Sequence, residues 1–474
     1  MTHGADAVQA NDHLELRSAR GRWVLAATVL GSGLALLDST VVNVALPYLG
    51  RELDARMDGL QWTINAYTLT LAGLILLGGS LGDRFGRRRV FLIGTVWFAV
   101  ASALCGLAPS IEVLVAARAL QGIGGALLTP GSLAIIQASF VRADRPRAVG
   151  AWSGLGGVAS AIGPLLGGWL VQTVGWRWAF LINLPFALLV VLVGVRHVPE
   201  SRDEQAVGRF DVLGSVLAAL ALAGITYGLI EKGAPVPLIA GLVLVAAFVA
   251  VEVRRSPDAL VPVGLFRNHV FAAVNVVTLV MYAAMGVVFF LLVVQLQVVS
   301  GFSPIAAGLA MLPTTVLMML LSARAGDVAK RVGPRWPMTL GILVAGGGFV
   351  WMSTIGPGAS YALQVLPAVS VFGLGLSAAV APLTSTVLAS ADERYAGTAS
   401  GVNNAVARTG SLLAVAAVPP LVGLVGDAFR DPLVFDAGFR TAMLISAGMM
   451  AVSALLTFFT IRTNVLAAED QPQS

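Results

Sequence analysis

The sequence predicts an all-α polytopic membrane protein, and three observations support that prediction. Hydrophobic residues make up 57% of the 474 residues and charged residues only 12%, against roughly 25% charged in an ordinary soluble protein. Apolar stretches of about 20 residues, each long enough to cross a ~30 Å hydrocarbon core, recur from Trp23 to Ile461. The alternating segments of about 10 residues that build a membrane β-barrel are absent. The composition therefore argues against a soluble enzyme and against a barrel.

Fourteen membrane spans are predicted, and the basic residues set their orientation. Lys and Arg concentrate in cytoplasmic loops, and 22 of the 30 fall on the side of the two tails and the even-numbered connections. Both termini are therefore predicted to be cytoplasmic and the number of spans even. The spans are 22–46, 60–80, 90–108, 111–133, 148–174, 178–196, 211–230, 236–253, 270–299, 304–324, 336–356, 361–390, 397–425 and 438–461.

A faint internal repeat predicts how these spans are grouped. The sequence from Gly82 to Gly86 closes the second span, and a looser basic sequence from Gly326 to Gly333 closes the tenth. Parallel halves of this kind are a known transporter design. The predicted organisation is a cytoplasmic tail, a six-helix half, a two-helix insert, a second six-helix half and a cytoplasmic tail, at residues 1–21, 22–200, 201–260, 261–462 and 463–474.

One acidic residue lies well inside a predicted span. Asp38 has apolar neighbours on both sides, and a charge there costs at least ~2.5–3.5 kcal/mol on insertion scales. Arg118 of the fourth span lies at a similar depth, since the two residues are roughly 12 and 10 Å from the same membrane face at 1.5 Å per residue. Burial disfavours the carboxylate charge and a guanidinium favours it. The pair therefore predicts a proton-coupling site, with a purely structural ion pair as the alternative.

Arg408, in the thirteenth span, is the other charge predicted to lie inside the membrane. No acidic residue occupies a matching position in another span. The side chain can pair with backbone carbonyls, or it can face an aqueous cavity and take part in transport. Both interpretations stay open at the level of the sequence.

The connection after the second span combines glycines with charges of both signs. Residues 79–89 read Gly-Ser-Leu-Gly-Asp-Arg-Phe-Gly-Arg-Arg-Arg, with the acid at a helix C-terminus and glycines around a tight turn. Basic residues alone would only report topology. Here we predict a charge latch between helices that acts as a conformational switch, formed by Gly82, Asp83, Arg84, Gly86, Arg87 and Arg88.

The fifth span carries small residues at helical spacing. A stripe of this kind lets another helix approach closely, and a Gly-Pro step permits a bend. Ordinary helix packing explains the same pattern, so the use of this face stays open. The residues concerned are Gly156, Gly157, Gly163, Pro164 and Gly167.

Taken in order, these segments resemble the major facilitator superfamily and, within it, the fourteen-helix drug:proton antiporters, the EmrB/QacA-type multidrug exporters. The resemblance covers residues 20 to 462 and implies the major facilitator fold with six, two and six helices. It also implies that Arg118 influences proton transfer and that the glycines of the fifth span form a motif typical of exporters. The matching segments are 37–47, 61–67, 79–89, 118–125, 154–168 and 176–185.

The resemblance implies a multi-pass exporter of the cytoplasmic membrane, driven by protons entering from outside. We expect a monomer that exports amphipathic compounds, with a preference for cationic ones that ionised Asp38 would attract. Some relatives carry another acid in the tenth span, but Met311 to Ser322 contains none. Substrate would be recognised by the cavity lining, although core packing is the alternative for each aromatic residue. The candidates are Asn43, Asn65, Tyr67, Tyr282, Phe289, Phe290, Gln295, Gln297 and Arg408.

Several other functions have little support in the residues. The four histidines lie in tails or at cytoplasmic connections without metal-ligand spacing, so a membrane-embedded enzyme is a weak alternative and no metal or cofactor is expected. Neither lysine sits in a phosphate-binding loop, so an ATP-driven pump would need a separate subunit. The basic pI of about 9.8 is explained by topology rather than by nucleic acid. The same fold dedicated to one metabolite, such as an antibiotic, siderophore or lipid precursor, is the strongest alternative.

Overall fold

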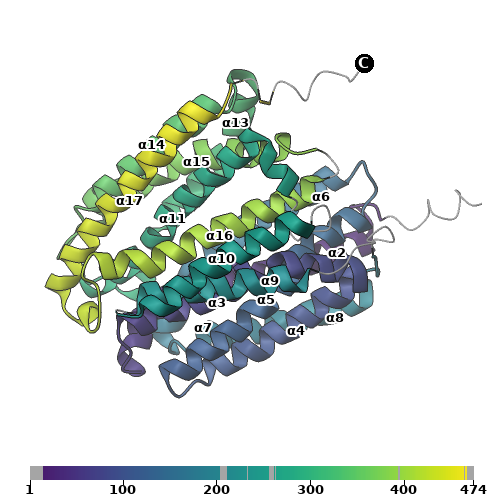
Figure 1. Cartoon of the computed structure of the whole chain (residues 1–474). Helices are drawn as coiled ribbons and strands as arrows, with labels where there is room; N and C mark the ends of the chain where they lie inside the picture. The colour runs from purple at the N-terminus through teal and green to yellow at the C-terminus, as the bar shows by residue number, and fades with distance from the viewer. Residues whose placement is uncertain are drawn as a thin grey trace, which may run out of the picture.

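In the computed structural model the chain is a bundle of long helices (Figure 1). The structure describes residues 14–202, 211–231, 233–255, 261, 263–392, 395–463 and 465–466, so most of both predicted tails and residues 203–210 of the predicted insert lie outside the described part. The helices are α2 (Ala19–Glu52), α3 (Met57–Phe85), α4 (Arg87–Gly106), α5 (Ile111–Ser139), α6 (Arg145–Thr173), α7 (Trp178–Leu181), α8 (Asn183–His197), α9 (Val212–Ile230), α10 (Pro235–Arg255), η1 (Val263–Arg267), α11 (His269–Val298), α12 (Pro304–Ala310), α13 (Leu312–Val332), α14 (Arg335–Met352), η2 (Tyr361–Val365), α15 (Leu366–Ala389), α16 (Ala396–Leu421), η4 (Ala428–Arg430) and α17 (Pro432–Thr460).

Each predicted span falls on helix, although three of the helices are interrupted. The sixth span is shared by α7 and α8, the tenth by α12 and α13, and the twelfth begins with the π-helical η2. Within the described residues, twelve helices or helix pairs are long and apolar enough to cross a membrane. The predicted eleventh and thirteenth spans correspond to α14 and α16, which are not among these twelve. The structure is thus an all-helical membrane protein with about twelve strongly apolar spans.

The helices form two groups that pack mainly within themselves. In the first group, α2 to α8, α5 packs on α3 and α4, and α2 packs on α6 and α8. In the second group, α11 to α17, α11 packs on α16 and α17, and α14 packs on α15 and α17. The pair α9 and α10 pack on each other, and α9 also contacts α3 and α16.

Small residues allow the closest of these contacts. A side chain at Gly78 of α3 would meet the Ala126 carbonyl of α5 at 2.1 Å, and one at Gly375 of α15 would meet the Ala345 nitrogen of α14 at 2.3 Å. Without a strong hydrophobic driving force between helices in lipid, such backbone approach supplies the packing energy. The Gly78 contact therefore fixes α3 against α5, two of the helices that carry the polar residues described below.

Hydrogen bonds join the two groups at one end of the bundle, which we call the distal end because it lies away from Leu14 and Ile461. The bonds are Gln61 Nε2 to the Val415 carbonyl (2.7 Å), Gln297 Nε2 to the Val44 carbonyl (3.0 Å), Met57 N to the Gly426 carbonyl (2.7 Å) and Arg430 Nη2 to Asp54 Oδ1 (2.5 Å). At the opposite, terminal end, the hydrogen bonds that the structure describes stay within one group, as between Arg20 and the His197 carbonyl. The two groups are thus held together distally.

Candidate functional site

Asp38 lies near the middle of α2 and is almost completely enclosed, with 1% of its surface exposed. Arg118, which begins the third turn of α5, is equally buried at 1%. Arg118 Nη1 lies 2.5 Å from Asp38 Oδ2. The contact expected from their depths is therefore formed, between two helices that are each held in the first group by glycine-mediated packing.

The second carboxylate oxygen of Asp38 accepts hydrogen bonds from two neutral amides. Gln121 Nε2, one turn after Arg118, donates at 2.7 Å. Asn183 Nδ2, at the start of α8, donates at 3.0 Å. Both side chains are fully buried. The carboxylate is therefore bound by one cationic and two neutral donors.

A further layer of contacts positions these donors. Ser102 Oγ of α4 accepts from Gln121 Nε2 at 2.7 Å and from Asn183 Nδ2 at 3.3 Å. Arg118 also donates to the Thr63 carbonyl of α3 at 3.0 Å and to Gln121 Oε1 at 2.6 Å. Five helices of the first group, α2, α3, α4, α5 and α8, thus converge on one carboxylate.

Aromatic rings cover the guanidinium on its remaining sides. The Arg118 guanidinium carbon lies 4.3 Å from the ring centroid of Tyr67 and 5.8 Å from that of Phe180. Cation–π contacts gain strength when both partners are desolvated. Arg118 therefore has favourable partners besides Asp38.

Sequence reasoning identified the charged pair and passed over the neutral part of the site. Gln121 and Asn183 fall inside segments that match the superfamily, yet Ser102 lies in none of those segments. The signal available for Gln121 is its spacing of three from Arg118, which puts both on one face of α5. Nothing local marks Asn183 and Ser102, because polar uncharged residues are tolerated in many spans.

The three cavity candidates of the first group have polar atoms without protein partners. The amide of Asn65 makes no hydrogen bond although the residue is fully buried. The Tyr67 hydroxyl and Asn43 Oδ1 are also buried and unpaired. Such groups usually have a partner, protein or water. These positions are therefore compatible with contact to water or to a bound solute.

The candidates on α11 separate into two kinds. Tyr282 and Phe289 are half-buried, with Phe289 edge-on to Phe372 at 6.0 Å between centroids. Phe290 is fully buried in the hydrophobic core, which is the packing alternative for an aromatic residue. Tyr282 and Phe289 are therefore more accessible than Phe290, although all three residues lie on one helix.

The two glutamines of α11 make structural contacts. Gln295 Nε2 donates to the Ile355 carbonyl at 2.8 Å and to Asp436 Oδ1 at 2.7 Å, inside the second group. Gln297 Nε2 donates to Val44 across the two groups, as described above. Their amide donors are occupied, so the structure places them in helix contacts and does not bring them to Asp38.

Arg408 lies halfway along α16 and donates from Nε to Asn404 Oδ1, one turn earlier, at 2.8 Å. Its surface is partly accessible. α16 packs on α3 and α11, the helices that carry Tyr67 and Tyr282, and both phenols lie near enough to influence the charge of Arg408. Arg408 therefore lies at the interface with the first group, near two other cavity candidates, Tyr67 and Tyr282.

The charged loop after α3 forms contacts inside the first group. Arg87 Nε of α4 donates to Asp83 Oδ1 of α3 at 2.8 Å across the turn at Gly86, whose φ of +108° favours glycine. The backbone nitrogens of Arg88 and Arg89 donate to the Glu200 carboxylate. The segment after α8 that contains Glu200 is therefore bound to the start of α4. Gly333 closes α13 with a similar positive φ of +83°, at the position of the predicted repeat.

The small-residue face of α6 contacts two other helices. A side chain at Gly163 would meet Thr40 Oγ1 of α2 at 1.9 Å, and one at Gly167 would meet the Val41 Cα at 2.9 Å. Gly156 lies near Leu36, whereas Gly157 has nothing within 4 Å of an added Cβ and is off this face. The Pro164 carbonyl faces Gly308 of α12. The glycines thus pack α6 against the helix that carries Asp38.

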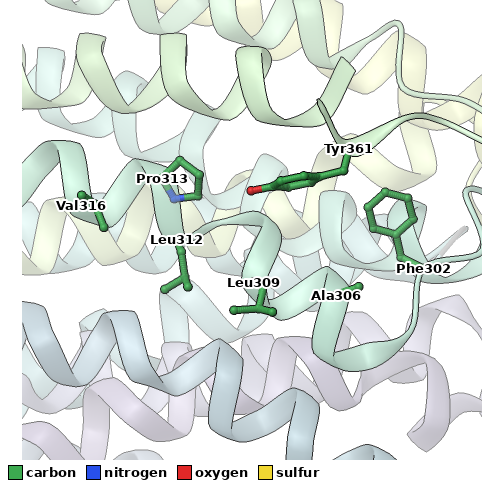
Figure 2. Close-up of a pocket in the computed structure, with 7 residues that line it drawn as sticks. All are labelled: Phe302, Ala306, Leu309, Leu312, Pro313, Val316 and Tyr361. Carbon is green, nitrogen blue, oxygen red and sulfur yellow. The ribbon is translucent and has the colours of Figure 1, made fainter. Parts of the chain in front are cut away.

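A pocket of about 670 Å³ lies apart from these residues, between α12, α13 and η2 (Figure 2). Its lining is apolar except for the hydroxyl of Tyr361, which reaches over Pro313 at the break between α12 and α13. It contains none of the predicted cavity residues. Among the described residues, no cluster of three or more His, Cys, Asp or Glu side chains is suited to hold a metal ion.

Comparisons with known proteins agree with this architecture. The chain is 35% identical over 430 residues to the tetracenomycin C resistance and export protein of Streptomyces glaucescens, which covers 88% of this chain and 80% of that protein. It is 33% identical to the puromycin resistance protein pur8 of Streptomyces alboniger (94% and 93% covered) and to the multidrug efflux pump LfrA of Mycolicibacterium smegmatis (91% and 84%).

Solved transporters share the fold at low sequence identity. A POT family transporter in complex with 5-aminolevulinic acid superposes with a TM-score of 0.72 at 13% identity, covering 93% of this chain and 97% of that chain. An inward-facing, unoccupied bacterial homolog of the human lysosomal transporter Spinster gives 0.67 at 16% identity, covering 96% and 100%. The family model described as Major Facilitator Superfamily matches residues 28–415. The chain belongs to the major facilitator superfamily.

Proposed function

We propose that the protein exports amphipathic, drug-like compounds across the cytoplasmic membrane in exchange for protons. The observation that carries the proposal is the buried Asp38–Arg118 pair, an ionisable group enclosed at mid-membrane depth in a chain of this superfamily. The export direction is supported by relatives that are named as antibiotic resistance, export or multidrug efflux proteins.

In the proposed cycle, Asp38 carries the proton. Binding of a proton to Asp38 weakens its contact with Arg118, and Arg118 then relies on the Thr63 carbonyl, Gln121 and the Tyr67 ring. The rearrangement moves α5 relative to α2, which biases the bundle toward the opposite access state. Alternation of this kind requires two arrangements of the same helices.

The driving force is sufficient for useful export. One pH unit is worth about 1.36 kcal/mol per proton, and about 100 mV adds about 2.3 kcal/mol per charge moved. Exchange of one proton for one neutral molecule therefore supports an outward ratio of several hundredfold. No cofactor is required in this scheme.

We further propose fourteen membrane helices in a six, two and six arrangement, with both termini cytoplasmic. Support comes from the fourteen predicted spans, each of which falls on helix, and from the distribution of Lys and Arg. The distal end is then extracellular.

We propose a role as conformational switch for the 82–88 loop, in keeping with the contacts of Asp83, Arg87 and Arg88.

Transport by purified protein in proteoliposomes tests the function. An imposed pH gradient without ATP should drive accumulation of dyes from a panel of ethidium, rhodamine 6G and fluorescein. Asp38→Asn should abolish the pH-dependent part while the protein is still produced, and Asp38→Glu should retain some activity because a titrating group remains. Normal pH-driven transport by Asp38→Asn would refute the assignment.

A dedicated exporter of one metabolite is the second candidate, since several relatives are named after a single antibiotic. One tight substrate and no dye transport would favour it. A requirement for ATP would instead indicate a pump that works with a separate nucleotide-binding subunit.

A further inference from the structure

Arg408 carries a charge that the surrounding protein does not balance. Within the described part of the chain, no carboxylate lies within ion-pair distance of its guanidinium, and the hydrogen bond it makes is to the neutral Asn404. Asp38, the buried acid of the first group's polar site, is already bound by Arg118, Gln121 and Asn183. A cation among protein groups normally has a counter-ion.

The position of Arg408 follows from the antiparallel packing of α3 and α16. Gln61 bonds to the Val415 carbonyl, and Leu76 lies 3.0 Å from the position of an added side chain at Gly401. On α16, Arg408 lies midway between Gly401 and Val415. On α3, Thr68 lies midway between Gln61 and Leu76. The guanidinium is therefore level with the Tyr67 turn, about 20 Å by helix rise from the distal end of α16.

Several hydrogen-bonding groups surround this level, and two of them have no protein partner. Asn404 is exposed on α16, and the buried Tyr67 hydroxyl makes no hydrogen bond. Asn65, half a turn away on α3, has an entirely unpaired amide. Tyr282 adds a second, half-buried phenol on α11, which packs on α16. The site therefore combines one uncompensated cation, part of it accessible, with neutral donors.

We propose that Arg408 binds an acidic oxygen group of the substrate, a carboxylate, phenolate or enolate, with Asn404, Tyr67 and Tyr282 as neutral partners. This inference rests on the proposed efflux function and replaces the preference for cations expected from Asp38. A guanidinium suits such oxygens because its donors form a planar fork. At this level a cationic drug would meet the positive charge of Arg408 and would find no free carboxylate to bind it.

The substrate site and the proton site are then different but adjacent. The Tyr67 ring lies against Arg118, and Arg408 is among the charges that act on the Tyr67 hydroxyl. Proton and substrate do not share a binding group, so binding of substrate at Arg408 releases the proton from Asp38 through rearrangement of the bundle. Export of an anion and entry of a proton move charge in the same electrical direction, and an inside-negative potential drives both.

Two xanthene dyes of similar size and opposite charge test the inference in proteoliposomes with an imposed pH gradient. Fluorescein carries acidic oxygens, and rhodamine 6G is a cationic ester. For Arg408→Gln we expect the KM for fluorescein to rise at least about tenfold, the loss of one charged hydrogen bond, with the KM for rhodamine 6G unchanged or lower. Arg408→Lys should retain much of the fluorescein affinity, because the charge remains.

Arg324→Gln is the matched control. Its guanidinium also bonds one turn back on its own helix, to the Leu320 carbonyl, but it is exposed on α13, and both KM values should stay at the wild-type level. An equal rise in KM for both dyes in Arg408→Gln, or none for either, would overturn the inference. Transport of rhodamine 6G but not of fluorescein by the wild-type protein would also overturn the inference. This outcome would leave the proposed efflux function intact. Transport of neither dye would end both proposals.

Discussion

The two oxygens of Asp38 have different partners, and this difference decides how a proton can enter. Oδ2 faces the Arg118 guanidinium, whereas Oδ1 accepts from the amides of Gln121 and Asn183. The amide donors keep a weaker hydrogen bond to the neutral acid, whereas the ion pair loses its Coulombic attraction. The geometry therefore indicates that the Arg118 side of the carboxyl group opens when the proton binds.

Removal of one amide donor should move the pH dependence of transport. Asn183→Leu keeps the side-chain shape and takes one hydrogen bond from the ionised carboxylate, so the proton is bound at higher pH. A hydrogen bond to a charged group is worth about 1.5 kcal/mol or more, and one pH unit is about 1.36 kcal/mol. The midpoint of the pH–rate profile of dye transport should therefore rise by about one unit.

A buried asparagine elsewhere provides the comparison for this profile. Asn275 of α11 donates to the Phe271 carbonyl in the second group, and Asn275→Leu should leave the midpoint in place. An unchanged midpoint in Asn183→Leu, with normal protein yield, would show that Asn183 does not act on the proton site.

Sequence reasoning succeeds at this site only for the charges. Asp38 and Arg118 are predictable because an ionised side chain in hydrocarbon is expensive and depth can be counted from the span ends. Asn183 and Ser102 lie on helices whose rotation about their axes is set by packing, which one sequence does not reveal. The accessibility of Tyr282 compared with Phe290 depends on the same rotation.

At the scale of elements, α6 is the helix that fixes α2. The Cβ directions at Gly163 and Gly167 point into Thr40 and Val41, within three residues of Asp38. This contact places backbone against backbone, so movement of α6 is transmitted directly to the segment that carries the carboxylate.

A side chain on this face should disturb both stability and transport. Gly167→Val places a Cβ 2.9 Å from the Val41 Cα, and backbone atoms cannot rotate away. Overpacking of this kind typically costs about 1–3 kcal/mol. We expect a lower unfolding temperature of the purified protein and at least a severalfold loss of transport rate.

Gly157→Val on the same helix provides the control, since nothing lies within 4 Å of its added Cβ. It should leave the unfolding temperature and the transport rate near the wild-type values. Equal effects of the two substitutions would mean that glycine is needed for helix flexibility and not for the contact with α2.

The elements themselves were predictable because about 20 apolar residues leave little choice but a spanning helix. Helix ends were less predictable than the elements themselves. For example, α2 extends from Ala19 to Glu52, beyond the predicted 22–46. Backbone hydrogen bonding continues past the apolar stretch. The break before α13 was also missed, although Pro313 lacks the N–H that a continuous helix would use there.

At the scale of the whole molecule, the distal bonds define the access state. The Gln61 amide is buried where it bonds to Val415, whereas the Arg430–Asp54 pair is largely exposed and therefore contributes little. The hydrogen bond that Arg430 donates to Asp54 raises the pKa of Arg430 above its usual range, so Arg430 stays charged at physiological pH.

Loss of the buried distal bond should shift the molecule toward separation of the two groups at that end. Gln61→Leu leaves two backbone carbonyls without their donor, at a cost of about 1–3 kcal/mol, which is a population shift of about fivefold to more than a hundredfold. Spin labels at the distal ends of α3 and α16 should report a larger fraction of long distances.

Gln364→Leu provides the matched variant, since Gln364 also donates to a carbonyl, that of Thr354, but within the second group. Its distance distribution should equal that of the wild type. A wild-type distribution for Gln61→Leu as well would show that this bond does not hold the distal end closed.

The central claim is that Asp38 is the group that exchanges a proton when substrate binds. Proton release from purified, weakly buffered protein measures this directly when a transported dye is added. We predict release of about one proton per molecule from the wild type and none from Asp38→Asn, provided that the variant still binds the dye. Equal proton release from both proteins would contradict the account.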